Sequence, residues 1–107
     1  MAIPIQDDLD AIVSRIGAIL PEAKVLLFGS YATGEYRNDS DIDLCVIAPE
    51  YQERRMEVLC SIRAAIRGAT KLPVDILAFT DEEFSRRAKL RSTIQHCIMN
   101  QGVLQNG

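Results

Sequence analysis

Two carboxylates, Asp41 and Asp43, stand two residues apart at the start of the apolar run DIDLCVIA. Side chains alternate across a β-strand, so residues i and i+2 point to the same face and these two carboxylates emerge side by side. Aspartate is disfavoured in strands, yet Asp75 interrupts a later apolar run in the same way, between Val74 and Ile76. The pattern indicates a chemical role for all three side chains.

Three converging carboxylates would favour a bound cation. Two like charges about 5 Å apart at an effective dielectric near 20 repel by roughly 3 kcal/mol. Mg²⁺ is the natural counter-ion, because it takes hard oxygen ligands and completes its shell with water and substrate phosphates. From these residues alone another interpretation stays open, in which Asp41 caps a turn, Asp43 makes a surface contact and Asp75 stands at a strand edge.

Gly29 and Ser30 directly follow the apolar run KVLLF. A glycine at the end of a strand lets backbone N–H groups face an anion, and the serine hydroxyl adds one donor. Gly34 would allow the chain to bend back toward the carboxylates. A plain turn also explains Gly-Ser taken alone, and the sequence lacks the GxxxxGK[ST] signature of Walker-type ATPases.

Apolar spacing predicts the elements that position these residues. Helical 3-4 spacing and short apolar runs predict helices over 5–20, 56–66 and 80–102, strands over 24–28, 41–48 and 73–79, and a turn or short helix over 30–38. Pro21 ends the first helix, and Thr80 with Glu83 forms a capping box. This order predicts one α/β sheet with helices packed on it and leaves the strand directions open.

The 107 residues suffice for one domain, 1–107. Neither a membrane span nor a signal peptide is predicted, because the apolar stretches are short and the N-terminus lacks a basic start. The three cysteines have no CxxC spacing and lie in apolar segments, which predicts reduced core thiols in a cytoplasmic protein: Cys45, Cys60 and Cys97. His96 is interpreted as an ordinary helix residue.

The net charge of −3 argues against direct binding of nucleic acid, which usually needs a basic surface. Basic residues gather in two stretches that are either solvated helix faces or a surface for an acidic partner or a phosphate tail: Arg54, Arg55, Arg63, Arg67 and Lys71, then Arg86, Arg87, Lys89 and Arg91. An apolar face near the C-terminus is interpreted as core in preference to an interface: Ile94, Ile98, Val103 and Leu104.

The runs GSYATG, from Gly29 to Gly34, and SDIDL, from Ser40, resemble the GSxxxG…SDxDL signature of minimal nucleotidyltransferases, which belong to the DNA polymerase beta-like superfamily. Asp75 matches the third carboxylate expected on a later strand. The resemblance covers nearly the whole chain and implies a single small nucleotidyltransferase domain, with a central mixed sheet of three or more strands flanked by helices.

The resemblance also implies a role for each motif residue. Gly29 and Ser30 would hold the phosphates of ATP, the nucleotide donor. Asp41 and Asp43 would bind two Mg²⁺ ions, and Asp75 would complete the second metal site and help to activate the attacking hydroxyl. Ser40 would orient the carboxylate strand by a hydrogen bond.

The sequence departs from the signature at two positions, where many relatives carry arginine and this chain has Tyr31 and Thr33. Arg37 or Lys71 could supply the phosphate contacts that these arginines make in relatives. If neither does, the contacts are absent, and whether the site is active stays open. Tyr31 is interpreted as a surface residue, a base-stacking residue or a partner contact.

The resemblance implies an antitoxin of a toxin–antitoxin pair, in which AMP is transferred from ATP to a hydroxyl of an all-helical HEPN-type toxin encoded nearby. Two alternatives remain at this level: a non-catalytic antitoxin that binds nucleotide and acts by contact, and an enzyme with a small acceptor such as an aminoglycoside. A homo- or hetero-oligomer is compatible with each of these functions.

Overall fold

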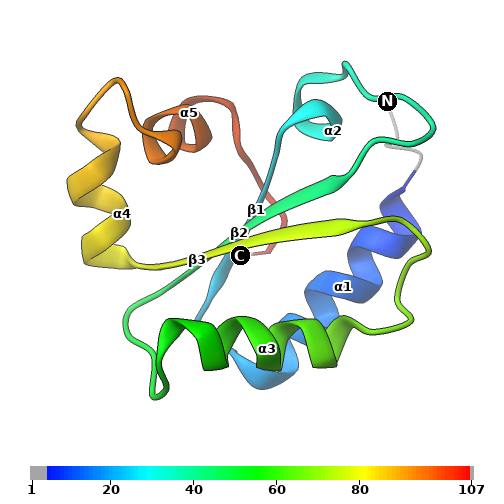
Figure 1. Cartoon of the computed structure of the whole chain (residues 1–107), viewed down its shortest axis with the longest axis horizontal. Helices are drawn as coiled ribbons and strands as arrows, with labels where there is room; N and C mark the ends of the chain where they lie inside the picture. Colours follow the sequence, from blue (N-terminus) through cyan, green and yellow to red (C-terminus); the bar gives the residue numbers. More distant parts are fainter. Residues whose placement is uncertain (1–4, 107) are drawn as a thin grey trace.

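The computed structural model describes residues 5–106 and shows a four-stranded sheet between two groups of helices (Figure 1). The elements follow one another as α1 (Gln6–Ile19), β1 (Lys24–Phe28), α2 (Ser30–Thr33), β2 (Ile42–Ala48), α3 (Arg55–Ile66), β3 (Val74–Thr80), α4 (Asp81–Ala88), α5 (Ile94–Gln101) and β4 (Val103–Leu104). None of the helices within this range is long and apolar enough to cross a lipid bilayer.

The sheet has the order β3-β2-β1-β4 and mixed strand directions. β1 pairs antiparallel with both β2 and β4, whereas β2 pairs parallel with β3. The parallel pair needs a long crossover, which α3 supplies. The expected α/β fold with a mixed sheet of three or more strands is therefore confirmed.

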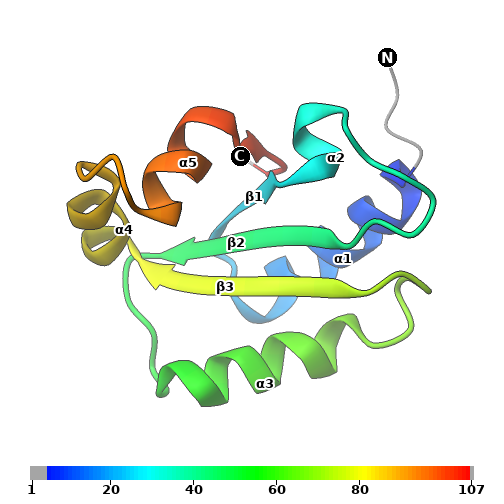
Figure 2. The same cartoon turned by 45° about the horizontal axis from the view of Figure 1, so that its top comes forward.

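The main hydrophobic core lies between the sheet and helices α1 and α3, which cover the same face (Figure 2). The alternate β2 residues Ile42, Leu44 and Val46 are fully buried there and pack with Ile12 of α1 and Ile62 of α3. Because strand side chains alternate, the intervening β2 residues must point to the opposite face.

The opposite face of the sheet carries a smaller cluster beneath α4 and α5. Its buried members are Cys45, Ile47 and Ile98, with partly buried neighbours that include Phe28 and Leu77. Asp43 lies two residues before Cys45 and so shares this face. The carboxylate thus emerges on the less completely covered side of the sheet.

The single helix predicted over 80–102 is wrong, because the chain forms α4 and α5 with a break between them. The capping box of Thr80 and Glu83 is present at the start of α4. Thr93 then starts α5, and its hydroxyl also lies 2.7 and 2.8 Å from the carbonyl oxygens of Arg87 and Leu90. In a continuous helix, backbone N–H groups would bond to these carbonyls. Because the Thr93 hydroxyl bonds to them instead, the first helix ends and a second one begins.

The C-terminal apolar face is core only at Ile98, which is fully buried. Ile94, Val103 and Leu104 are 48%, 44% and 49% exposed. Val103 and Leu104 form the edge strand β4, which was not predicted from the sequence because two residues show no periodicity. The Asn106 amide secures this end by bonding to the backbone at both sides of Lys24, at 2.8 and 2.9 Å.

The prediction of three core thiols holds only for Cys45, because Cys60 and Cys97 are exposed. Cys60 lies in α3 between the buried residues Val58 and Ile62, and a helix rotates by about 100° per residue, so Cys60 points away from the sheet. An apolar neighbourhood in sequence does not determine which side of a helix a thiol occupies.

Candidate active site

The neighbouring strands β2 and β3 place two of the predicted carboxylates in one row. Asp43 of β2 is the register partner of Asp75 in β3 and of Phe28 in β1. Register partners project to the same face of a sheet, and neighbouring strands lie about 4.8 Å apart. The parallel pairing of β2 with β3 therefore sets the Asp43 and Asp75 side chains next to each other.

Asp41 lies one residue before β2 and is exposed, as is Asp75, whereas Asp43 is half-buried. Burial raises the pKa of the Asp43 carboxyl, and the charges of Asp75 and Asp41 raise it further. Asp43 is thus close enough to both Asp41 and Asp75 for their charges to act on it. We call Asp41, Asp43 and Asp75 the carboxylate row.

The carboxylate row fits Mg²⁺ in the type of its donor atoms, since hard oxygen ligands are what this ion prefers. Within residues 5–106, however, no three acidic, histidine or cysteine side chains are arranged to hold one metal ion as they stand. Asp41 and Asp75 are exposed and free to turn. Chelation of one ion by all three carboxylates would therefore require their side chains to move.

Gly29 connects β1 to α2 and lies directly against Asp43. Its backbone has φ 74° and ψ −155°, a conformation that only glycine adopts readily. A β-carbon at residue 29 would overlap the Asp43 Oδ2 atom and would lie 3.0 Å from the Asp43 Cγ atom. The turn therefore requires glycine here, and a β-carbon would also force the carboxylate beside it to move.

Ser30 is the first residue of α2, a helix of one turn. Among residues 5–106, the backbone N–H groups of Ser30 and Tyr31 have no hydrogen-bond acceptor, whereas those of Ala32 and Thr33 donate to the Gly29 carbonyl oxygen at 3.1 Å. Free N–H groups at such a turn are suited to an anion. These two N–H groups are the donors that the turn could offer to an anion.

Gly34 ends α2 with φ 86°, and its N–H donates to the Ser30 carbonyl oxygen at 3.0 Å. The chain then reaches Ser40, which forms a closed turn with Arg37. The Ser40 hydroxyl accepts the Arg37 N–H at 2.7 Å, and the Ser40 N–H donates to the Arg37 carbonyl oxygen at 3.1 Å. Ser40 thus orients the loop that leads into the carboxylate row.

Tyr31 is neither a surface residue nor available to stack on a base, so the earlier interpretations of it are wrong. It is only 5% exposed and belongs to the main core. Its ring stacks on Tyr36, with centroids 5.0 Å apart and an interplanar angle of 15°. Packing of α2 against β1 and β2 turns Tyr31 inward, which the neighbouring residues in the sequence could not reveal. Thr33 is exposed and its hydroxyl lies 3.4 Å from the Ser30 carbonyl oxygen.

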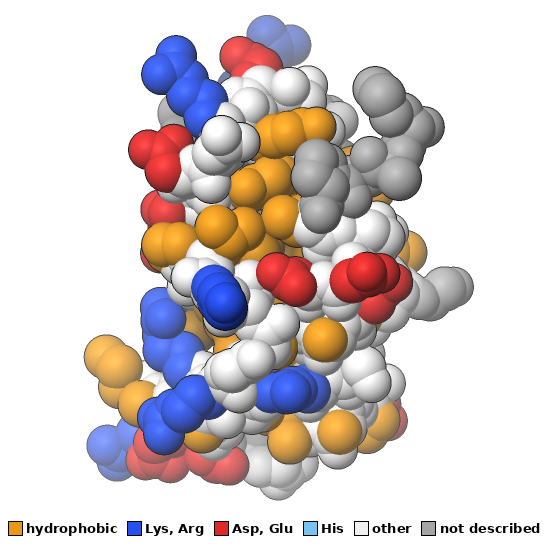
Figure 3. Space-filling view, turned by 90° about the vertical axis from the view of Figure 1, so that its right-hand side faces the viewer, with side chains coloured by type: hydrophobic (Ala, Val, Ile, Leu, Met, Phe, Trp, Pro, Cys, Tyr) orange, Lys and Arg blue, Asp and Glu red, His pale blue; other side chains and the backbone are white. Residues whose placement is uncertain are grey.

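Basic side chains lie at the same end of the molecule as the carboxylate row. Arg37 and Lys71 are exposed on the loops that precede β2 and β3. Figure 3 views this end and shows acidic side chains across its middle, with lysine and arginine side chains below them. Arg63, which its position in the sequence did not relate to the site, also lies at this end, because its Nη1 atom is 3.4 Å from the Val74 carbonyl oxygen, beside Asp75. A contact to a backbone carbonyl leaves no signal in sequence.

His96 lies outside the carboxylate row and links the two C-terminal helices. Its Nδ1 atom is 2.8 Å from the Ala88 carbonyl oxygen, and its Nε2 atom is 3.0 Å from the Asn100 amide nitrogen. A carbonyl can only accept and an amide NH₂ can only donate, so the neutral Nδ1–H tautomer satisfies both bonds. The geometry agrees with an ordinary helix residue.

Comparison with known proteins identifies the family of this chain. The model of the nucleotidyltransferase domain family matches residues 9–100. The chain belongs to this family. The matched segment contains the Gly29-Ser30 turn and the whole carboxylate row. The nucleotidyltransferase resemblance read from the sequence is therefore confirmed, and the chain is a nucleotidyltransferase domain.

Solved structures share the fold of this nucleotidyltransferase domain. A candidate nucleotidyltransferase from Sulfolobus solfataricus is 22% identical and has a TM-score of 0.61, with 97% of this chain and 86% of that chain covered. A toxin–antitoxin structure with AMP-PNP is 24% identical with a TM-score of 0.58, and covers 92% of this chain and 72% of that chain. No curated protein matches the chain.

Proposed function

We propose that this nucleotidyltransferase domain transfers AMP from ATP to a hydroxyl of a partner protein, with Mg²⁺ as cofactor, and acts as the antitoxin of a HEPN-type toxin. The observation that carries the enzymatic part is the arrangement of Gly29, Asp43 and Asp75. A turn with free N–H groups, suited to phosphates, lies against the central member of a carboxylate row, suited to divalent cations.

Each residue of the site has a distinct task in this proposal. The Gly29-Ser30 turn holds the triphosphate through its backbone N–H groups and the serine hydroxyl. Asp41 and Asp43 hold divalent cations, and Asp75 completes the second cation site and receives the proton of the attacking hydroxyl. When bound, the cations stabilise charge on the attacking and leaving oxygens.

The reaction balances as a displacement at the α-phosphorus of ATP. The acceptor oxygen forms a bond to this phosphorus as the bond to the bridging oxygen breaks, and pyrophosphate leaves with the electron pair. The hydroxyl proton passes to the Asp75 carboxylate and from there to solvent. The domain contributes position and electrostatics, which is what phosphoryl chemistry chiefly requires.

The partner class rests on one line of support and is compatible with the site. The chain shares its fold with a toxin–antitoxin structure with AMP-PNP. Asp41 and Asp75 are exposed, so a hydroxyl carried by a partner protein can approach the carboxylate row.

The direct test uses this protein together with the HEPN-type protein encoded beside it. ATP labelled at the α-phosphate and ATP labelled at the γ-phosphate are compared in the presence of Mg²⁺. Label from the α-phosphate alone should appear on the partner, and Asp41→Asn with Asp43→Asn should abolish it. Asp39→Asn is the matched control, because it removes one exposed carboxylate of the same loop, outside the carboxylate row.

The same experiment separates catalysis from contact. A partner that binds the protein and remains unlabelled would refute the transfer reaction. Full neutralisation of the partner by the Asp41→Asn, Asp43→Asn variant would show that contact alone is the function. Labelling of an aminoglycoside in place of the partner would move the acceptor to the small-molecule class.

A further inference from the structure

A groove lies at the end of the sheet opposite to the carboxylate row. Two cavities of about 330 and 230 Å³ share Ile19, Leu20, Glu50 and Gln52, so they form one continuous depression, which we call the α1 groove. It lies where α1 and β2 end, whereas Asp43 is near the start of β2. The larger cavity is in the size range of ligand sites, roughly 300–1,000 Å³.

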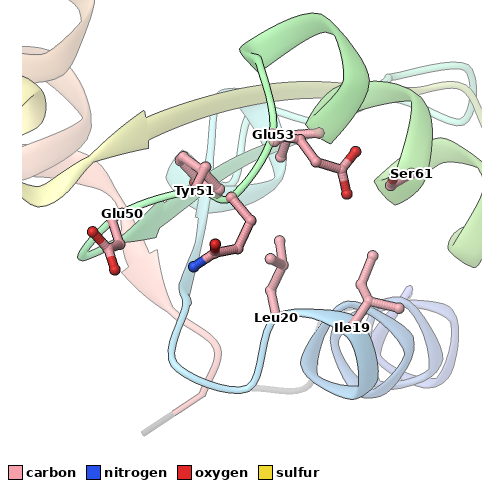
Figure 4. Close-up of a pocket in the computed structure, with 8 residues that line it drawn as sticks. Ile19, Leu20, Glu50, Tyr51, Glu53 and Ser61 are labelled. Atoms are coloured by element: carbon pink, nitrogen blue, oxygen red, sulfur yellow. The ribbon is translucent and has the colours of Figure 1, made fainter.

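The floor of the α1 groove is apolar and one wall is held in place. Ile19 and Leu20 project from the end of α1 toward the segment that carries Glu50 and Tyr51 (Figure 4). Ile19 is 43% exposed although it is a large hydrophobic residue. The Tyr51 hydroxyl lies 3.0 Å from the carbonyl oxygens of both Val46 and Phe79, which ties this segment to β2 and β3. The groove is therefore formed without a ligand.

The charges that line the α1 groove are all negative. Glu22, Glu50 and Glu53 line its two cavities, and no lysine, arginine or histidine does. The Glu53 carboxylate points into the opening (Figure 4). The two ion pairs found within residues 5–106 use Glu82 and Glu83, so the three groove carboxylates have no cationic partner there. A cationic group would complement them.

The C-terminal end of α1 adds to this negative potential. Pro21 has no N–H to reach the Gly17 carbonyl, and the carbonyls of Ala18 and Ile19 also lack donors among residues 5–106. The last turn of α1 contains no basic residue. A helix C-terminus carries about half a negative elementary charge, which favours a nearby cation.

We infer that the α1 groove binds a segment of a partner protein that presents an arginine or lysine between apolar side chains. The aliphatic stem would pack on Ile19 and Leu20, and the charged head would meet Glu53 and the end of α1, with Glu50 adding negative charge at the far side of the groove. An acidic segment or a nucleic acid would be repelled. A partner held here leaves the carboxylate row open, so this inference does not depend on the proposed reaction.

Two short fluorescein-labelled peptides serve as probes, one with arginine between two leucines and one with glutamate in its place. Binding is followed by fluorescence anisotropy and is mapped by amide chemical shifts on the full chain. The arginine peptide should shift amides around the α1 groove. Glu50→Gln with Glu53→Gln should weaken it about fivefold. The control pair Glu35→Gln, Glu57→Gln changes the net charge equally at exposed sites outside the groove and should leave affinity unchanged.

Several results would overturn the inference. The arginine peptide could bind elsewhere, fail to bind, or bind no better than the glutamate peptide. Both variant pairs could weaken it equally, which would indicate general charge attraction. Concentration-dependent dimerisation that perturbs the same groove amides in the absence of peptide would assign the groove to a second copy of this chain. Asp43→Asn should bind the arginine peptide normally, whatever it does to the transfer reaction.

Discussion

Gly29 and Asp43 are in direct contact across the turn that ends β1: a β-carbon on residue 29 would overlap the carboxylate of residue 43. This contact places the turn suited to phosphates against the carboxylate row. The Gly29-Ser30 turn and the aspartate near the start of the next strand are separated in sequence by α2 and the loop after it, and this contact joins them into one structural unit.

Substitution of the two glycines of the motif should separate backbone strain from this contact. Gly34→Ala meets open space and only the strain of positive φ, so it should lower the free energy of unfolding by about 1–2 kcal/mol. Gly29→Ala adds the overlap with Asp43 and should lower it by roughly 3 kcal/mol. Urea unfolding measures both values. Asp43→Ala is then added to Gly29→Ala. If the double variant recovers none of the extra loss in the free energy of unfolding, the overlap with Asp43 is not the cause of that loss.

The ionised carboxylate row should destabilise the metal-free protein. The pKa of Asp43 is raised in the folded state by burial and by Asp75 and Asp41, so the folded state holds this proton more tightly and stability falls as the pH rises through its titration. In EDTA at neutral pH, Asp43→Asn should therefore raise the free energy of unfolding by up to about 1 kcal/mol, since solvent screens much of the repulsion. Asp39→Asn should not. A loss of stability in Asp43→Asn would contradict this.

Mg²⁺ should stabilise the folded protein if the carboxylate row holds it. At about one hundred times the dissociation constant the gain is roughly 2.7 kcal/mol, which thermal unfolding would detect. Asp41→Asn with Asp43→Asn should remove the gain, and Asp39→Asn should preserve it. An equal Mg²⁺ effect in all three proteins would place the ion elsewhere.

Glu83 should contribute stability that is lost in acid. Its hydrogen bond with Arg55 is the largest cause that lowers its pKa below 4.5, so the contribution is present above that value and lost as the pH falls through the lower folded value. Glu83→Gln keeps the capping-box geometry but removes the charge. It should cost no more than about 1 kcal/mol at neutral pH, because the pair is partly exposed, and nothing in strong acid.

Glu82→Gln is the control for this pH dependence, because Glu82 is 87% exposed and its nearest cation, on Arg86, is 3.9 Å away. Urea unfolding at several pH values should show little difference for Glu82→Gln. If Glu83→Gln lowers the free energy of unfolding by the same amount in acid as at neutral pH, the charge of Glu83 is not the source of the stability that its contact with Arg55 provides.

Two of the three thiols should react rapidly with a thiol reagent. Cys60 and Cys97 are exposed, whereas Cys45 is fully buried and its burial raises its pKa to about 12. The reactive species is the thiolate, so Cys45 should react only after unfolding. Cys60→Ser and Cys97→Ser should each remove one rapid equivalent in a spectrophotometric assay. A rapid reaction that survives both substitutions would show that the core opens.

The sequence by itself determined the elements with strong periodicity and the identity of the carboxylate row. Apolar runs predicted β1 with its observed bounds, and the strand around Asp43 with a start one residue earlier than the observed β2. Helix α3 and the capping box at Thr80 follow equally from local spacing and hydrogen bonding. These features depend on neighbours along the chain.

Only the tertiary structure decided the rest, because it depends on residues distant in sequence. The parallel register of β2 and β3 makes Asp75 the neighbour of Asp43, and α2 turns Tyr31 into the core. The side of α3 that faces the sheet leaves Cys60 outside. The α1 groove is formed by the end of α1 and the segment after β2, which no local pattern relates. Local sequence specifies which residues share a face of an element, and packing determines which face is buried and what it meets.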